Sequence, residues 1–95
     1  KNALVKDETN SEIYYNLGNL NAVQNQFEQA IPLYQRAIAL NKNEPDYYNN
    51  LAMCYRQTGQ THKALSVFAE GLKLFPDSPL LVKNETEMKK SLIKK

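Results

Sequence analysis

Apolar and small residues recur along this chain at helical spacing, and they do so in pairs of short segments. Tyr14, Leu17 and Gly18 share one face of a predicted helix, and Ala30 and Tyr34 share one face of the next. A short polar segment separates the two. The pattern therefore predicts pairs of amphipathic helices joined by tight turns.

The pattern repeats with a fixed period in residue number (48 − 14 = 34). When residues 11–44 are placed above residues 45–78, size and polarity match at the recurring positions. The matching pairs are Tyr14 with Tyr48, Leu17 with Leu51, Gly18 with Ala52, Ala30 with Ala64, Tyr34 with Phe68, Ala37 with Gly71, and Leu40 with Leu74. Small residues at fixed points let two helices approach closely, and aromatic residues fill the spaces beside them. Two complete helix pairs of one kind are predicted.

Residues that favour turns and helix starts fall between the predicted helices. Asn25 and Gly59 occupy the same point of the two units, and both residue types tolerate the left-handed backbone that ends a helix. Pro45 and Pro79 open the following units, where the missing N–H of proline has no helical partner anyway. Pro32 falls inside a second helix. We expect a continuous but bent helix there, with a broken helix as the alternative.

These positions resemble the signature of the tetratricopeptide repeat (TPR) family, a helix–turn–helix unit with the same period. The second unit carries Tyr48-x2-Leu51-Ala52-x2-Tyr55, then Ala64-x3-Phe68, then Pro76. The first unit carries Tyr14-x2-Leu17-Gly18 and then Ala30-x3-Tyr34. It departs from the signature at Asn21 and Lys42, where Tyr and Pro are usual. The resemblance covers residues 11–78 and implies an all-α, right-handed solenoid of antiparallel helix pairs.

Both ends of the chain are predicted to be partial units. Ala3-Leu4 stands one period before Ala37-Ile38 (37 − 3 = 34), so residues 1–10 are interpreted as the tail of a preceding repeat's second helix. Residues 79–95 are interpreted as a first helix that caps the C-terminal end, which gives about five helices in all. In this cap the polar residues Glu85, Thr86 and Lys89 replace packing residues, as the end of a solenoid requires. The chain is thus interpreted as the C-terminal fragment of a larger TPR array.

The composition and the few potentially reactive residues limit the kinds of partner and site that we expect for this chain. The net charge of +2 is too small to indicate a nucleic-acid or membrane-surface partner, and no apolar run reaches the roughly 18 residues of a membrane span. Cys54 shares a predicted packing row with Leu20 and Met88, which indicates a buried, inert thiol. His62 has no cluster of metal ligands around it. We expect no catalytic residue, no metal site and no cofactor.

The main functional signal is a row of asparagines on the other side of the first helices. Asn16, Asn50 and Asn84 are each one period apart (50 − 16 and 84 − 50). Packing residues have a structural reason to repeat, whereas solvated asparagines have none. A carboxamide offers donors and an acceptor, so such a row can grip the backbone of an extended peptide. The alternative is that these asparagines serve helix–helix geometry or bond a neighbouring carbonyl. A similar row lines the TPR superhelix of the protein O-GlcNAc transferases, which hold extended polypeptide.

The TPR resemblance implies that the first helices line a concave surface. Neighbours of the asparagine row would then read the side chains of a bound peptide. The predicted contacts, besides the row, are Tyr15, Asn19, Asn49, Met53, Arg56 and Lys83. The charges on this face are mixed, so we expect no net steering by sign. They are Glu12, Asp46 and Glu87 against Arg56, Lys83 and Lys90.

One TPR activity is disfavoured. Chaperone-binding TPR domains clamp a C-terminal carboxylate with two asparagines and three basic residues. Asn19 and Asn50 match the asparagines, but Tyr15, Leu80 and Asn84 stand at the basic positions, so the charge-assisted bonds are missing.

The predicted function is therefore a protein–protein interaction module that binds an extended peptide or partner segment on the concave face. One alternative is a structural segment of a longer TPR scaffold, which could form a homodimer through exposed repeat faces. The other is the substrate-docking arm of a larger enzyme such as a glycosyltransferase.

Overall fold

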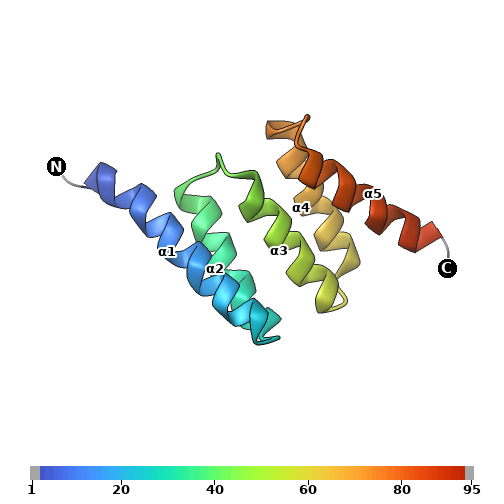
Figure 1. The fold of residues 1–95 in the computed structure, drawn as a ribbon, viewed down its shortest axis with the longest axis horizontal. Helices are drawn as coiled ribbons and strands as arrows, with labels where there is room; N and C mark the ends of the chain where they lie inside the picture. The colour runs from blue at the N-terminus through green and yellow to red at the C-terminus, as the bar shows by residue number, and fades with distance from the viewer. Residues whose placement is uncertain (1–2, 94–95) are drawn as a thin grey trace.

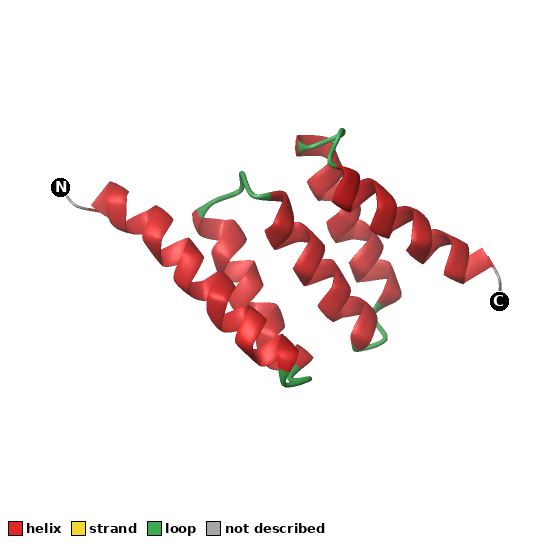
Figure 2. Ribbon diagram, in the orientation of Figure 1, coloured by secondary structure: helices red, strands yellow, loops and turns green. Residues whose placement is uncertain are grey.

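Five α-helices make up the part of the chain that the computed structural model describes, which is the backbone of residues 3–93 and the side chains of residues 11–92. They are α1 (Ala3–Val23), α2 (Phe27–Leu40), α3 (Pro45–Gln57), α4 (Thr61–Leu74) and α5 (Pro79–Ile93), shown in Figure 1. The described residues contain no strand (Figure 2). The predicted all-α fold class is confirmed.

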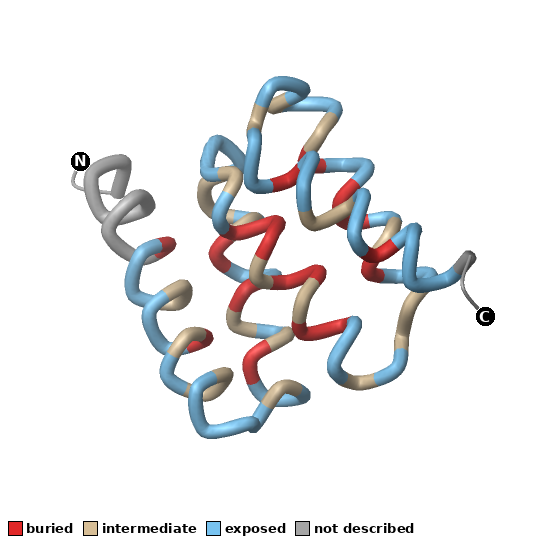
Figure 3. The backbone as a smooth tube through the Cα atoms, turned by 45° about the vertical axis from the view of Figure 1, so that its right-hand side comes forward, coloured by how far each residue is buried: buried red, intermediate tan, exposed pale blue. Residues whose placement is uncertain are grey.

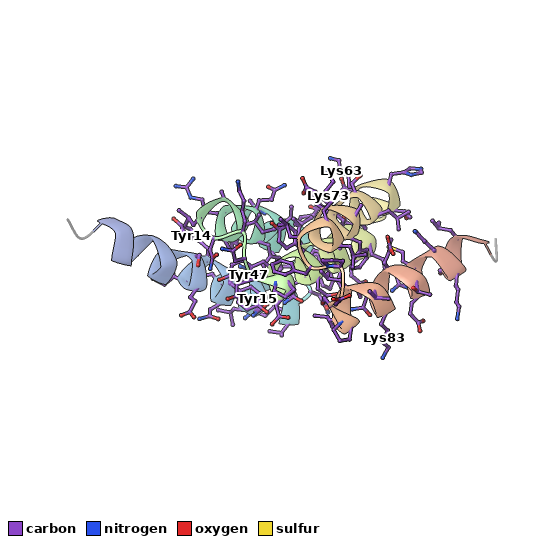
Figure 4. All side chains as sticks on the ribbon, turned by 90° about the horizontal axis from the view of Figure 1, so that it is seen from above. Tyr14, Tyr15, Tyr47, Lys63, Lys73 and Lys83 are labelled. Carbon is purple, nitrogen blue, oxygen red and sulfur yellow. The ribbon has the colours of Figure 1, made fainter. Side chains whose placement is uncertain are left out.

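The helices form two layers. Seen from above in Figure 4, α1, α3 and α5 lie on one side and α2 and α4 on the other. α1 packs against α2, and α3 packs against α4. In addition, α3 and α5 each pack against the helix pair before them. This is the predicted TPR-type solenoid. We call the outer side of α1, α3 and α5 the first-helix face.

The helix ends follow the turn chemistry of the sequence. Asn25 has φ 63° and Gly59 has φ 81°, so both adopt the predicted left-handed backbone. The N–H groups of the residues that follow, Gln26 and Gln60, donate to the carbonyls of Asn21 and Tyr55 at 2.8 Å. Pro45 and Pro79 are the first residues of α3 and α5.

The helix around Pro32 is continuous, as expected, since α2 runs from Phe27 to Leu40 with the proline inside it. Proline cannot donate to the carbonyl of Glu28, which an ordinary residue at this position would do. Glu28 is exposed, so water can bond that carbonyl oxygen instead. The alternative of a broken helix is therefore wrong.

The N-terminal end of the chain differs from the prediction. α1 continues without a break from Ala3 through Ser11, so residues 3–10 are not the tail of a separate second helix. No proline or glycine interrupts this stretch, and helix once formed propagates through such a sequence. Residues 1–2 of the predicted tail lie outside the described residues. At the other end the predicted capping helix is α5, and residues 94–95 lie outside the described part.

The core lies between the two layers and is built from the recurring positions (Figure 3). α5 closes it with Leu81 and Met88. The other buried members are Ala30, Tyr34, Tyr48, Leu51, Ala52, Cys54, Tyr55, Ala64, Val67 and Phe68. Leu17, which the repeat placed among the packing residues, is exposed because no described helix covers that side of α1.

Gly18 permits the close approach of α1 and α2. A Cβ atom on Gly18 would stand 2.7 Å from Cε1 of Tyr34, whose ring is fully buried and whose hydroxyl is bonded to Asn19. The ring therefore has little room to move away.

We expect Gly18→Ala to lower the free energy of unfolding by about 1–2 kcal/mol, because overpacking outweighs the better helix propensity of alanine. Urea unfolding measures this change. Ser66→Ala, on the exposed side of α4, is the control and should stay within about 0.5 kcal/mol of the parent. A Gly18→Ala protein as stable as the parent would contradict the close packing.

Candidate peptide-binding groove

A chain of side-chain hydrogen bonds crosses the first-helix face from α1 to α5. Asn50 stands at its centre, where its Nδ2 donates to the Tyr15 hydroxyl (3.2 Å) and to Asn19 Oδ1 (3.0 Å). Its Oδ1 accepts from Asn49 Nδ2 at 3.1 Å, and Asn49 Oδ1 accepts from Asn84 Nδ2 at 2.6 Å. We call these five residues the amide network. It ties together the first helices of three successive units.

The amide network supplies a structural reason for asparagine to recur once in each repeat. The bonds from Asn50 to Tyr15 and from Asn84 to Asn49 are equivalent, since both have a sequence separation of 35. In both, an asparagine donates to the first helix of the preceding unit. The argument that asparagines on this face have no structural reason to repeat is therefore wrong for Asn50 and Asn84. Asn16 is exposed, and no described helix precedes α1 to accept the same bond.

Two predicted contact residues are turned into the protein. Asn49 is buried, and both ends of its amide are bonded within the chain. The Tyr15 ring centroid lies 4.7 Å from that of Tyr47 and 5.8 Å from that of Tyr34. Figure 4 shows Tyr15 and Tyr47 side by side between α1 and α3. Burial raises the pKa of the Tyr15 hydroxyl. Asn49 and Tyr15 therefore hold neighbouring helices together through contacts within the chain.

A hollow of about 280 Å³, which we call the α1–α3 pocket, lies where the C-terminal halves of α1 and α3 meet. Three of the predicted residues, Asn19, Asn50 and Met53, line it. The rest of its wall is Ala22, Val23, Phe27, Tyr34, Cys54 and Gln57. Apolar walls with a few carboxamides are the usual make-up of a site that takes an apolar side chain and bonds the amide beside it.

A second hollow, of about 250 Å³, lies near the starts of α1 and α3. Two predicted residues, Tyr15 and Asn16, line it together with Glu12, Glu44, Asp46 and Tyr47. Its lining contains three carboxylates and no basic residue, so the charges of this face are not evenly mixed. Glu44 was missed by the sequence analysis because it precedes α3 and therefore has no place in a helical pattern.

The remaining predicted contacts lie outside both hollows. Arg56 and Lys83 are exposed. In Figure 4, Lys83 projects from α5 on the side opposite to Lys63 and Lys73.

Tyr34 was assigned to packing alone, yet its hydroxyl donates to Asn19 and joins the amide network to α2. The signal for this role was available, because a buried tyrosine hydroxyl needs a hydrogen-bond partner.

Burial keeps two potentially reactive groups, the Cys54 thiol and the Tyr34 hydroxyl, in their neutral forms. Burial raises the pKa of the Cys54 thiol to about 11 and that of Tyr34 to about 12. This agrees with the predicted buried and inert thiol. Within the described residues, no three His, Cys, Asp or Glu side chains are grouped so that they could hold a metal ion. No helix in the same part of the chain has the length and apolar character needed to cross a membrane.

The amide network predicts different stability effects for two asparagines of one row. Asn50→Ala removes three hydrogen bonds and leaves the groups that were bonded to Asn50 without those bonds. We therefore expect a loss of about 1–3 kcal/mol in the free energy of unfolding. Asn16→Ala should cost less than about 0.5 kcal/mol, because Asn16 is exposed. Urea unfolding of both variants measures the difference. Equal effects would contradict the structural role of Asn50.

Comparison with known proteins agrees with this architecture. The tetratricopeptide repeat family model matches residues 9–77. A search of curated proteins found no match. Among solved structures, the chain is similar to the crystal structure of MamA, with a TM-score of 0.70 and 27% sequence identity. That match covers 97% of this chain and 66% of the MamA chain, so the chain spans just under two thirds of MamA. Because the family model covers well over half of the 95 residues, the chain belongs to the tetratricopeptide repeat family.

Proposed function

We propose that this protein-interaction scaffold binds an extended peptide or partner segment on its first-helix face, with the α1–α3 pocket as the main contact. The observation that carries the proposal is the make-up of that pocket. Phe27 and Met53 give it apolar walls, and Asn19 and Asn50 place carboxamides beside them. An apolar side chain of the partner would enter the pocket while its backbone meets the amides.

The hydrogen bonds of the amide network indicate which groups remain for a ligand. Both hydrogens of Asn50 Nδ2 are already donated within the chain. Asn19 Oδ1 accepts from Tyr34 and from Asn50, and a side-chain hydrogen bond also joins Asn19 to Tyr15. A carboxamide nitrogen carries two hydrogens, so Asn19 Nδ2 keeps a donor for a peptide carbonyl, and the second lone pair of Asn50 Oδ1 is suited to a peptide N–H.

The preferred ligand follows from these surroundings. The pocket favours an apolar residue such as leucine or methionine, because its walls are largely apolar. The carboxylates Glu12, Glu44 and Asp46 disfavour an acidic partner segment near the starts of α1 and α3. Arg56 and Lys83 stay predicted contacts for the stretch of partner that continues toward α5.

We propose no catalytic role for this chain. The support is that binding accounts for the pocket, while the buried thiol and hydroxyl that border it stay protonated at neutral pH. If the chain serves as the docking arm of a larger enzyme, the same groove would hold the substrate polypeptide.

Selection from a random library of dodecapeptides, displayed on phage against the immobilised chain, tests the proposal. Fluorescence anisotropy of the selected peptides then gives their affinities. We expect saturable binding by peptides that share an apolar residue, and weaker binding by versions in which that residue is replaced by aspartate. Failure to select any peptide that binds better than its scrambled sequence would overturn the proposal.

A further inference from the structure

A hollow of about 270 Å³, which we call the α2–α4 hollow, lies between the C-terminal ends of the two second helices. It shares no lining residue with the α1–α3 pocket or with the hollow near the starts of α1 and α3. The lining residues are Ile38, Lys42, Tyr48, Glu70, Lys73 and Leu74. The α2–α4 hollow is therefore separate from the groove on the first-helix face.

The floor of the α2–α4 hollow is held in a fixed shape. Tyr48 of α3 is 3% exposed, and its ring centroid lies 6.4 Å from that of Phe75. The Tyr48 hydroxyl donates to the Lys42 carbonyl at 3.2 Å. Gly71 lets α4 approach this side chain closely, since a Cβ atom there would stand 3.0 Å from Cβ of Tyr48. A ligand that enters a hollow with such a fixed floor loses little affinity to the ordering of protein groups.

Aliphatic side chains border this floor. Leu74 is 51% exposed at the last position of α4, and Ile38 of α2 is partly buried. Together with the Tyr48 ring, they offer an apolar surface that solvent can reach. Covering that surface with an aliphatic side chain of a partner removes apolar area from water, which favours binding.

Two lysines line the same hollow. Lys42 follows α2 at the repeat position where proline is usual, and Pro76 stands at the equivalent position of the next unit (42 + 34). Lys73 lies in the last turn of α4. Neither ammonium group forms an ion pair with a carboxylate of the described residues. Among the described lining residues Glu70 is the only carboxylate, so the lining has a net charge of +1 (2 − 1).

The surrounding layer has the same sign of charge. Residues 27–42 and 61–74, which contain α2 and α4, have a net charge of +2 (4 − 2). The charged residues are Arg36, Lys42, Lys63 and Lys73 against Glu28 and Glu70. Figure 4 shows Lys63 and Lys73 on the same side of the molecule. Charge complementarity therefore favours an acidic partner on this side, whereas three carboxylates line the hollow near the starts of α1 and α3.

We propose that the α2–α4 hollow is a second docking site, which binds an acidic segment of a partner protein through one aliphatic side chain flanked by carboxylates. The aliphatic side chain would lie on the Tyr48 ring beside Leu74. The flanking carboxylates would pair with Lys42 and Lys73. The proposal depends neither on the amide network nor on peptide binding in the α1–α3 pocket.

Nuclear magnetic resonance titration of the chain with a defined peptide tests this proposal. The probe peptide has one leucine between two aspartates, with two glycines at each end. We expect saturable shifts of the methyl signals of Ile38 and Leu74, with the side-chain signals of Asn19 and Met53 unchanged. Control peptides replace the leucine by glycine, or both aspartates by lysine. Each control should bind at least about fivefold more weakly, because it lacks the apolar contact or carries the wrong charge.

Charge changes in the lining should shift the affinity for the probe in opposite directions. At about 0.1 M salt, Lys73→Gln should lower the affinity about two- to fivefold. Glu70→Gln should raise it about two- to threefold, because it removes a like charge. Both residues are exposed, so the fold should persist. Lys63→Gln is the matched control: it removes the same charge about 15 Å away along α4, beyond the screening length, and should leave the affinity unchanged.

Several results would overturn the proposal. Shifts centred on Asn19 and Met53 would place the probe in the α1–α3 pocket instead. Equal effects of Lys73→Gln and Lys63→Gln would show that only the net charge matters. Absence of saturable binding, or equal binding of the peptide without leucine, would remove the hollow as a docking site. None of these results bears on the peptides selected for the first-helix face, so the two proposals can fail separately.

Discussion

Tyr34→Ala is expected to lower the free energy of unfolding by about 3–5 kcal/mol, the largest stability change that we predict. The ring of Tyr34 is fully buried between the layers, against Gly18 on one side and within 5.8 Å of the Tyr15 ring. Its hydroxyl donates to Asn19. The substitution would open a cavity and at the same time disturb the amide network. For a domain of this size, that loss removes a large share of its stability.

Tyr34→Phe separates the two contributions, because it keeps the ring and removes only the hydroxyl. Asn19 Oδ1 would still accept from Asn50, so we expect a cost of about 0.5–1.5 kcal/mol. Urea unfolding followed by circular dichroism measures both variants. If Tyr34→Ala and Tyr34→Phe cost the same, the packing of the ring is not what holds α2 against α1.

The second large effect concerns binding. We expect Met53→Glu to lower the binding affinity of the selected peptides at least about tenfold, because it places a carboxylate in the apolar wall of the α1–α3 pocket. Met53 is only partly buried, so the glutamate can reach water in the free chain and the fold should persist. Fluorescence anisotropy with labelled peptide gives the affinities.

Two controls accompany this change. Met53→Leu keeps an apolar side chain of similar volume and should stay within about threefold of the parent affinity. Ser66→Glu adds the same charge on the exposed side of α4, in the other layer, and should leave the affinity unchanged. Equal weakening by Met53→Glu and Ser66→Glu would show that charge alone, and not the pocket, governs binding.

The helices and turns were predictable because their causes are local. The repeat period places the small and aromatic residues, and the left-handed backbone of Asn25 and Gly59 follows from residue type. Pro45 and Pro79 mark helix starts for the same kind of reason. These signals fixed five helices and their pairing, apart from the extension of α1 toward its N-terminus.

The roles of the polar residues were less predictable, because they depend on distances between helices. The spacing of Asn50 and Asn84 is visible in the sequence, but their partners Tyr15 and Asn49 lie on the first helix of the preceding unit. An extended peptide and a neighbouring helix offer an amide the same kind of bond. Only the packed structure shows which bonds are made inside the chain.

The exposure of Leu17 has a similar cause. Its position in the repeat marks it as a packing residue, and the equivalent Leu51 is buried. Whether such a residue is covered depends on the helix pair stacked against it, so the repeat pattern alone does not determine its burial.

Nuclear magnetic resonance of the chain with a selected peptide tests the central claim most directly. We predict intermolecular contacts from the apolar residue of the peptide to the Met53 methyl group and the Phe27 ring, and from its backbone to the side-chain amide of Asn19. Contacts confined to the exposed sides of α2 and α4, with the Met53 and Asn19 signals unchanged, would contradict the assignment of the first-helix face as the binding surface.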